Sequence, residues 1–191
     1  MIEEDELLKI LEKNKNIQLI LDLAGSLGAP NWYLAAGCIS QTVWNVNHGF
    51  DPENGIKDYD LIYCDADDIT SESQEYFIEK GKDLFKGISV SVEIVNEARV
   101  HLWYKKHFGY EVNKDRYFSS EEAINAWPTT ATAVGVMKNE KGEYKIYAPF
   151  GLDDLLGMVV RANKVKITEE YYNSKVDRWT KIWPKLSVVP W

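Results

Sequence analysis

The order of hydrophobic patterns in this sequence predicts an α/β (α+β) fold, a mixed β-sheet flanked by helices with a hairpin and C-terminal helices appended. Three observations indicate it. Helical and strand periodicities alternate from the N-terminus to residue 95. Two segments, residues 58–65 and 88–95, have the apolar content or the period-two alternation of strands. Two further β-rich runs follow within residues 130–150, and helical patterns follow them.

The first elements surround a glycine. Residues 3–27 carry leucine and isoleucine at spacings of three and four, which predicts two short helices. Residues 32–36 (WYLAA) form an apolar run typical of a buried strand, and Gly37 ends it. Apolar residues from Ile39 onward then predict a helix that ends at His48–Gly49. The order is therefore strand, glycine turn and helix.

Two strands with a helix between them come next. The polar segment 48–58 is rich in turn residues and precedes the strand at 58–65. Ser71, with Gln74 three residues later, is a capping-box signal for a helix over 72–86. Residues 88–95 (ISVSVEIV) then alternate with period two, as a strand with one buried face does.

The second half adds helical segments and one hairpin, each with a start or stop signal in the sequence. The predicted elements are a helix over 96–107, a short helix capped by Ser119 with Glu122 and ended by Pro128, a hairpin that turns at Asn139–Gly142, a helix over 152–160, and a helix from Thr168 that carries Tyr172, Val176, Trp179 and Trp183.

Length and composition favour one domain over residues 1–191, because 45% hydrophobic residues in 191 can fill one sizeable core. The acidic start MIEEDELLKILEK differs from signal and transit peptides, and the apolar runs are too short to span a bilayer. Cys38 and Cys64 lie in apolar surroundings without partners at metal-ligand spacing, which is typical of buried thiols. We therefore expect a cytoplasmic protein without membrane contact.

The net charge restricts the class of partner. The sequence has 22 basic and 30 acidic residues, so its formal charge is −8. Such a charge repels a long polyanion unless a local basic patch overrides it. Extended nucleic acid is therefore not an expected partner.

Three acidic residues have the setting of a metal site. Asp58 and Asp60 are two apart on a predicted strand, so they project from one face with Cα atoms about 7 Å apart. Glu93 lies mid-strand between apolar residues, where an unpaired carboxylate is costly to bury. If the two strands are neighbours, all three carboxylates can converge and offer the hard oxygen ligands that Mg²⁺ takes beside substrate phosphates. An ion pair of Glu93 with a basic residue is the alternative.

The glycine turn fits the same chemistry. Because Gly37 lacks a Cβ, the backbone there can approach a triphosphate, and the helix that follows presents free N–H groups. Ser40 in the first helical turn can donate a further hydrogen bond. The ordered set is a glycine turn, then Asp-x-Asp, then a single acid on a later strand.

Six segments within residues 34–186 stand out together: AAGCISQTVWN, DYDLIYCD, NEARVHLWY, AWPTTATAVGV, APFGLDDLLGM and RWTKIWPKL. In these segments the sequence resembles bacterial nucleotidyltransferase-like proteins of the polymerase-β-like superfamily. The resemblance implies a polymerase-β-like nucleotidyltransferase fold with a catalytic core over 28–100 and a C-terminal helical part, 150–191, packed on it. It implies Asp58 and Asp60 as paired ligands of Mg²⁺ (or Mn²⁺), with Glu93 as the third.

The resemblance also implies nucleotide contacts. Gly37 and Cys38 fall in the phosphate-side turn, where relatives usually have Gly-Gly or Gly-Ser, and Ser40 stands where many relatives have arginine. Arg99 and His101 fall in NEARVHLWY and are candidate phosphate or acceptor contacts, whereas a solvated charged face is the alternative.

Three functions stay open at this point. The first is metal-dependent transfer of an NMP group from an NTP to a hydroxyl of a small molecule, a protein or an RNA end, with release of pyrophosphate. The second is a nucleotide- or ligand-binding module without turnover. The third is an interaction protein that uses its aromatic C-terminal helix, although tryptophans four apart on a helix are more often core residues.

Overall fold

The structure is a computed structural model that describes residues 2–109 and 116–191. Its main sheet has five strands in the order β3-β2-β1-β4-β5. The strands are β1 (Tyr33–Ala35), β2 (Asp58–Tyr63), β3 (Ser91–Asn96), β4 (Gly135–Lys138) and β5 (Tyr144–Tyr147). β2 and β3 are parallel and the other neighbours are antiparallel, which confirms the predicted mixed sheet with an appended hairpin.

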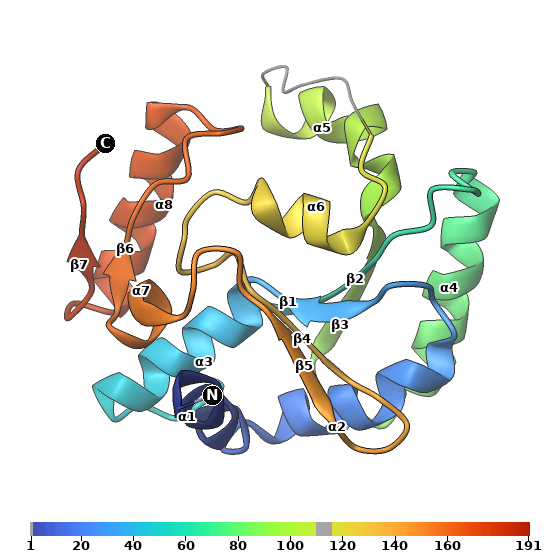
Figure 1. Ribbon diagram of the computed structural model, residues 1–191, viewed down its shortest axis with the longest axis horizontal. Helices are drawn as coiled ribbons and strands as arrows, with labels where there is room; N and C mark the ends of the chain where they lie inside the picture. Colours follow the sequence, from blue (N-terminus) through green and yellow to red (C-terminus); the bar gives the residue numbers. More distant parts are fainter. Residues whose placement is uncertain (1, 110–115) are drawn as a thin grey trace.

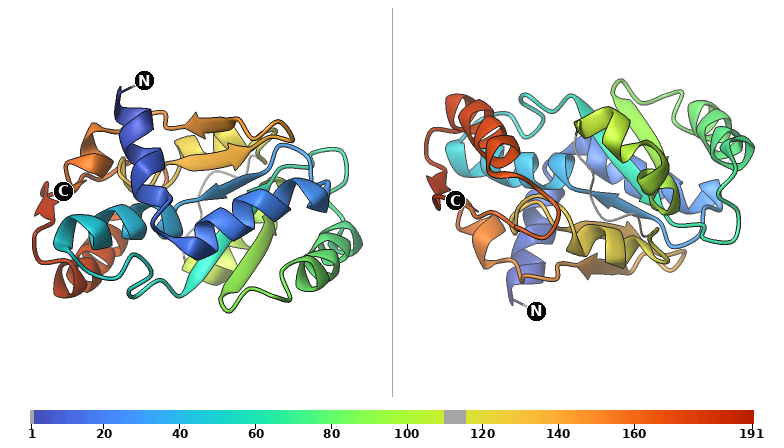
Figure 2. Two further views of the ribbon diagram at one scale, coloured as in Figure 1. Left: turned by 90° about the horizontal axis from the view of Figure 1, so that it is seen from below. Right: turned by 90° about the horizontal axis from the view of Figure 1, so that it is seen from above.

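Helices cover the sheet on both sides (Figures 1 and 2). They are α1 (Ile2–Leu11), α2 (Lys15–Ala24), α3 (Gly37–His48), α4 (Ser71–Leu84), α5 (Val100–Phe108), α6 (Ser120–Asn125), α7 (Asp153–Leu156) and α8 (Glu169–Ile182), with short 3₁₀ turns at Gly25–Leu27 and Glu97–Arg99. Seen from below, α1, α2 and α3 lie in front of the sheet, and seen from above α5, α6 and α8 do (Figure 2).

Alternation along β2 gives the sheet two chemically different faces. Tyr59 and Leu61 point into the large core that α1, α2, α3 and α4 complete. Asp60 and Ile62 point to the other face, because successive side chains of a strand alternate. There Ile62 packs with Ile124 of α6 in a smaller cluster. The charged side chains of β2 therefore face the side of α5, α6 and α8.

A buried asparagine explains the break between the first two helices. The side chain of Asn14 caps α2 by accepting a hydrogen bond from the N–H of Ile17 at 3.0 Å. Its amide also donates to Thr42 Oγ1 of α3 at 2.9 Å, so it ties the two N-terminal helices to the core. The prediction of two short helices that meet near this residue is confirmed.

Three predicted boundaries were wrong for local reasons. Thr70 caps α4 in place of Ser71, because its side chain accepts from the N–H of Ser73. The strand predicted from residue 88 begins at Ser91, since the N–H of Ile88 donates to Phe85 in a turn after α4.

The helix predicted over 152–160 ends at Leu156. Met158 has a positive φ of 55°, which a continuing helix excludes. Val159–Val160 then form β6, a short strand parallel to β7 (Ser187–Val188).

The tryptophans of α8 and the residues after it belong to the core. Trp44 of α3 packs edge-on against Trp179 and Trp183 at centroid distances of 5.2 Å. The indole N–H of Trp183 donates to Asn45 Oδ1 at 2.7 Å. All three tryptophans are buried, which confirms the core interpretation. Trp179 and Trp183 also contribute to the wall of a cavity beside β2.

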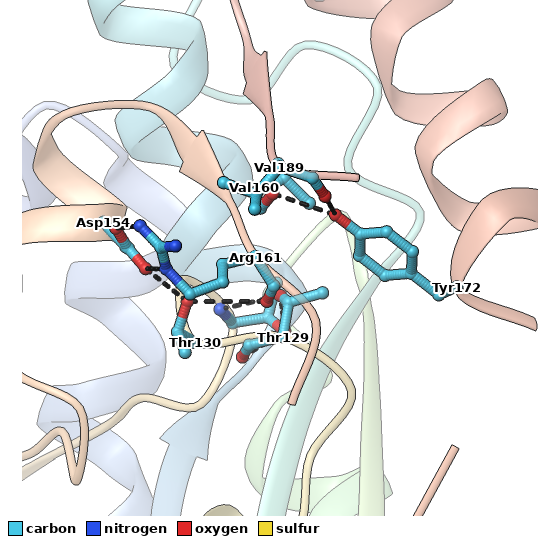
Figure 3. A network of polar contacts seen from close by, with 8 residues as sticks. Thr129, Thr130, Asp154, Val160, Arg161, Tyr172 and Val189 are labelled. Carbon is cyan, nitrogen blue, oxygen red and sulfur yellow. Dashed lines mark hydrogen bonds and ion pairs between the residues drawn. The ribbon is translucent and has the colours of Figure 1, made fainter. Parts of the chain in front are cut away.

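A polar network joins the C-terminal segments to the loop after α6 (Figure 3). The hydroxyl of Tyr172 lies 2.9 Å from the carbonyl oxygen of Val160 and 2.7 Å from that of Val189, so α8 holds the β6–β7 pair. Arg161 donates to Asp154 at 3.0 Å, and the hydroxyl of Thr130 donates to the same carboxylate at 2.6 Å. The network fixes the loop at residues 127–132 beside α8.

Both cysteines are buried free thiols, as expected. Within residues 2–109 and 116–191, none of the helices has the length and apolar character to cross a membrane.

Candidate functional site

The parallel pairing of β2 and β3 brings the predicted acidic residues to one face of the sheet. Asp60 is the register partner of Glu93, and Asp58 is the partner of Ser91. Because paired residues on neighbouring strands point to the same side, Asp58, Asp60 and Glu93 share the face of α5, α6 and α8. The prediction that the two strands are neighbours is confirmed.

The three carboxylates differ in exposure. Asp58 and Asp60 are half-buried, whereas Glu93 is exposed. The expectation that Glu93 is a buried carboxylate in mid-strand was therefore wrong. β3 is an edge strand, so the side chain of Glu93 lies at the rim of the sheet, where water reaches it.

Asp60 is the electrostatic centre of this face. Burial and then the negative charges of Asp58 and Glu93 together raise its pKa to about 7, while the ammonium of Lys175 opposes them. The carboxylate of Asp60 thus lies where negative charge accumulates and solvent is largely excluded, which is the setting of a cation site.

A cavity of about 440 Å³ opens beside the two aspartates. The turn from β1 into α3 forms one wall, and α8 forms the opposite wall. The polar side chains that line it are Gln41, Lys57, Asp58, Asp60, Thr132, Lys175 and Arg178. Its size falls within the usual range of small-molecule sites. This space is called the first cavity below.

The turn from β1 into α3 presents backbone to the first cavity. Ala36 has φ 54° and ψ −117°, a backbone conformation that residues other than glycine rarely adopt. Gly37 begins the helix directly after it. The first N–H groups of a helix have no intrahelical acceptor, so this end of α3 can donate to an anion. Ala36 and Gly37 both line the cavity.

The side chains of Cys38 and Ser40 point away from the first cavity. Both are fully buried. The thiol of Cys38 donates to the carbonyl oxygen of Ala35 at 3.3 Å, and the hydroxyl of Ser40 donates to the carbonyl oxygen of Ala36 at 3.2 Å. Neither is among the lining residues, so any contact of these two residues with a nucleotide in this cavity would come from backbone.

Two cations of α8 complete the first cavity. Lys175 and Arg178 line it opposite the aspartates. Burial and then the charge of Arg178 lower the pKa of Lys175 to about 8, whereas the charges of Asp60 and Asp58 raise it. The ammonium of Lys175 also lies over the ring of Tyr171, 4.9 Å from its centroid. Positive and negative side chains therefore meet at one point of the sheet.

A second cavity of about 330 Å³ adjoins the first, and Asp60, Lys175 and Trp127 line both. Its walls are aromatic and aliphatic and also carry the carboxyl groups of Asp60, Glu93 and Glu97 and the ammonium groups of Lys166 and Lys175. Glu97 is 6% exposed, and burial followed by the charge of Asp60 raises its pKa to about 8.

Arg99 and His101 lie outside both sets of lining residues. Arg99 donates to the carbonyl oxygen of Ile69, in the loop before α4. Its charge contributes to the lowered pKa values of Asp68 in that loop and of Glu72 in α4, and it is not among the charges that shift the pKa of Asp60. The structure thus directs Arg99 to the loop between β2 and α4.

Among the described residues, no three histidine, cysteine, aspartate or glutamate side chains are arranged to hold one metal ion. The roles of Asp58, Asp60 and Glu93 as metal ligands stay a prediction. The chemistry of the donors still fits Mg²⁺, since this ion is commonly bound by one or two carboxylates, with water and substrate phosphates as its other ligands.

Sequence reasoning missed Glu97, Lys175 and Arg178 as site residues. A signal for the two cations existed, because Tyr171, Lys175 and Arg178 follow the i, i+4, i+7 spacing of one helix face. Their charges were uninformative without the knowledge that α8 faces β2.

Comparisons with known proteins agree with this geometry. The family model described as "Nucleotidyltransferase" matches residues 22–188, so the chain belongs to the nucleotidyltransferase family. A search of the curated proteins gave no match.

Two solved structures are similar. One, described by "The NMR structure of the protein reveals a CCA-adding enzyme head domain", has 25% identity and a TM-score of 0.75 over 98% of this chain and 96% of that one. Its likeness supports the polymerase-β-like fold. The other, a "tRNA-processing enzyme (apo form 2)", has 14% identity and a TM-score of 0.41 over 89% of this chain and 44% of that one.

Proposed function

We propose that this nucleotidyltransferase moves an NMP group from an NTP to a hydroxyl acceptor, with release of pyrophosphate. The observation that carries the proposal is the meeting of Asp58 and Asp60 with Lys175, Arg178 and the start of α3 around one cavity. Phosphoryl-group chemistry needs positioning and charge compensation more than a protein nucleophile. These groups supply both.

The first cavity holds the triphosphate in this proposal. Backbone N–H groups at Gly37 donate to phosphate oxygens from one side. Lys175 and Arg178 contact them from the other side, and charge-assisted hydrogen bonds of this kind are among the strongest in proteins. Lys57, an exposed residue at the start of β2, adds a further positive charge at the rim.

Asp58 and Asp60 would hold Mg²⁺ or Mn²⁺ in the proposed site, with Glu93 beside them. When bound, such an ion neutralises charge on the phosphates as the transfer proceeds. The protein's own part is to keep Asp60 largely shielded from water and to align the two carboxylates on one strand face. Lys175 faces the same carboxylates. With an ion bound to the carboxylates, its ammonium would donate hydrogen bonds to the phosphates.

The transfer is an in-line displacement. The oxygen of the acceptor hydroxyl forms a bond to the α-phosphorus, and the bond from that phosphorus to the bridging oxygen breaks. Pyrophosphate leaves with the electron pair of the broken bond, and the hydroxyl proton passes to a carboxylate. Glu93 is exposed and lines the second cavity, so we assign the proton to it.

The similar head domain supports the reaction class. That domain is described as the head domain of a CCA-adding enzyme. For this chain we take from it the transfer of a nucleotidyl group, and the acceptor is treated separately below.

Labelled nucleotides test the proposal. Wild-type protein with each γ-labelled NTP, Mg²⁺ and a set of hydroxyl compounds as acceptors should release labelled pyrophosphate, and Asp58→Asn and Asp60→Asn should reduce the rate by about 10²-fold or more, because each removes charge from the reacting centre. Asp177→Asn is the matched control, since Asp177 is exposed on α8 and lines neither cavity. Equal rates in all four proteins would contradict the proposal.

A binding module without turnover is the second candidate. The side chains of Cys38 and Ser40 are turned into the protein, so the turn offers an anion only backbone donors from these residues. Calorimetry with an NTP and Mg²⁺ separates the candidates, because saturable binding without pyrophosphate release favours the module.

A further inference from the structure

The second cavity lies next to the proposed triphosphate site and differs from it in chemistry. Resting on the proposed function, we infer that this cavity binds the acceptor, and that the acceptor is a small, ring-containing hydroxyl compound without negative charge. The inference excludes the phosphate-rich end of a nucleic acid as the ligand of this cavity.

Size and wall composition favour a ring compound. The cavity is about 330 Å³, near the lower limit of small-molecule sites. Among the described residues, aromatic side chains from α5, α8, the loop after α6 and the segment before α6 line it. They are Trp103, Tyr104, Tyr117, Trp127 and Tyr171. Aromatic walls favour planar or apolar groups through stacking and edge-to-face contacts.

Charge separates the two cavities. Lys57, Lys175 and Arg178 line the first, as a triphosphate requires. The second has the carboxylates of Asp60 and Glu93 in its wall, together with Glu97, whose raised pKa of about 8 keeps it protonated near neutral pH.

The second cavity also has Lys166, but this ammonium is engaged within the protein. It donates to the hydroxyl of Tyr117 at 2.9 Å and lies over the same ring, 4.2 Å from its centroid. The other ammonium of this wall, that of Lys175, also lines the first cavity, where it contacts the triphosphate in the proposed function. An anionic ligand would therefore meet the carboxylates while both ammonium groups have other partners.

The electrostatics of Glu97 agree with this reading. Burial and the charge of Asp60 raise the pKa of Glu97 to about 8, so the surroundings already oppose negative charge. A phosphate or carboxylate on the ligand would meet the same unfavourable surroundings, whereas a neutral or cationic ligand would not.

The position of the cavity suits an acceptor. Asp60 and Lys175 line both cavities, so a hydroxyl presented from the second meets a phosphate held in the first at this junction. Glu93 lines only the second cavity, on the side from which the hydroxyl proton would leave.

A matched set of ligands tests the charge rule. Tyrosol, tyramine and 4-hydroxyphenylacetate share a phenol ring and have a neutral, a positive and a negative tail, respectively. Adenosine and AMP add a neutral and an anionic compound that share another ring system. We expect saturable binding of the neutral and cationic compounds, measured by ligand-observed NMR on the full chain with Mg²⁺ and a non-hydrolysable NTP. The anionic compounds should bind about tenfold more weakly or worse. Equal or tighter binding of the anionic compounds would overturn the inference.

Two variants locate the binding. Val95 lines only the second cavity, so Val95→Phe should fill it and weaken ring compounds about tenfold, while NTP affinity stays unchanged. Trp103→Ala removes an aromatic side chain from the wall and should weaken the binding of ring compounds about 3- to 10-fold. Circular dichroism shows whether each variant folds. Unchanged ring-compound binding in a folded Val95→Phe protein would overturn the inference.

The outcomes separate this inference from the proposed function. NTP binding and pyrophosphate release without binding of any ring compound, or with labelling of an RNA oligonucleotide only, would overturn the acceptor inference and leave the transfer proposal standing. Absence of NTP binding, with ring compounds still bound and lost in Val95→Phe, would contradict the proposed function but support a ligand site in the second cavity.

Discussion

Asp60 of β2 and Glu93 of β3 are register partners on parallel strands, and both side chains face the side of the sheet that α8 covers. This pairing places an acidic strand pair opposite Lys175 and Arg178. The charge pattern of the proposed site thus depends on a helix that begins more than a hundred residues after β2 ends.

The cations of α8 should control nucleotide affinity. We expect Lys175→Met and Arg178→Ala each to weaken NTP binding about tenfold or more, because each removes a charge-assisted contact. Isothermal calorimetry measures the change. Lys181→Met is the control, since Lys181 is exposed on the same helix and does not line the first cavity. An effect of the same size in the control would indicate nonspecific charge attraction.

Metal affinity should depend on pH through Asp60. Its pKa is raised to about 7, first by burial and then by Asp58 and Glu93, so below pH 7 a proton competes with the ion. Binding of Mn²⁺ with a non-hydrolysable NTP should be about tenfold weaker at pH 6 than at pH 8. Calorimetry in buffers of different ionisation enthalpy should show proton release on binding. Asp60→Asn should bind the ion weakly at both pH values, and a wild-type affinity independent of pH would contradict the assignment.

Glu97 should make the protein less stable as pH rises. Burial raises its pKa from 4.5 to about 8, so between these values the folded state holds a proton that the unfolded state has lost. Its stabilising contribution is complete below pH 4.5 and is lost as pH rises through 8.

Urea unfolding of wild type and Glu97→Gln at pH 5 and pH 9 checks this assignment. The free energy of unfolding of the variant should gain on the order of 2–4 kcal/mol relative to wild type between the two pH values. Glu143→Gln, at an exposed hairpin position, should show no such gain. A pH-independent difference between Glu97→Gln and wild type would contradict the assignment.

Gly81 should be required for the contact of α4 with β3. A Cβ at Gly81 would overlap Cδ1 of Ile94, which is buried in the core. Gly81→Ala should lower the free energy of unfolding by about 1–2 kcal/mol, although alanine favours helix. The double variant Gly81→Ala with Ile94→Val should recover most of that loss, since valine lacks the overlapping carbon. Additive losses in the double variant would show that this overlap is not the cause.

Local patterns predicted the strands that carry the acids. Strands within residues 58–65 and 88–95 were recognised because apolar content and alternation are properties of the strand itself. The glycine turn before α3 was recognised for the same reason. Predicted boundaries were wrong where contacts with a segment distant in the sequence determine the structure. At residues 152–160, pairing of Val159 and Val160 with β7 takes the place of the predicted last helical turn.

The site could be predicted only in part. Asp58, Asp60 and Glu93 were found because they share two adjacent strands, but the exposure of Glu93 follows from its edge position, which the sequence does not encode locally. Lys175 and Glu97 contribute through tertiary packing alone. The side chains of Cys38 and Ser40 turn inward because the helix and the preceding strand supply nearer acceptors.

A crystal structure with Mn²⁺ and a non-hydrolysable NTP tests the central claim most directly. We predict anomalous density for Mn²⁺ between the carboxylates of Asp58 and Asp60 and the triphosphate, with the phosphates against Gly37, Lys175 and Arg178. A nucleotide bound outside the first cavity, or a metal ion that leaves both aspartates uncoordinated, would contradict it.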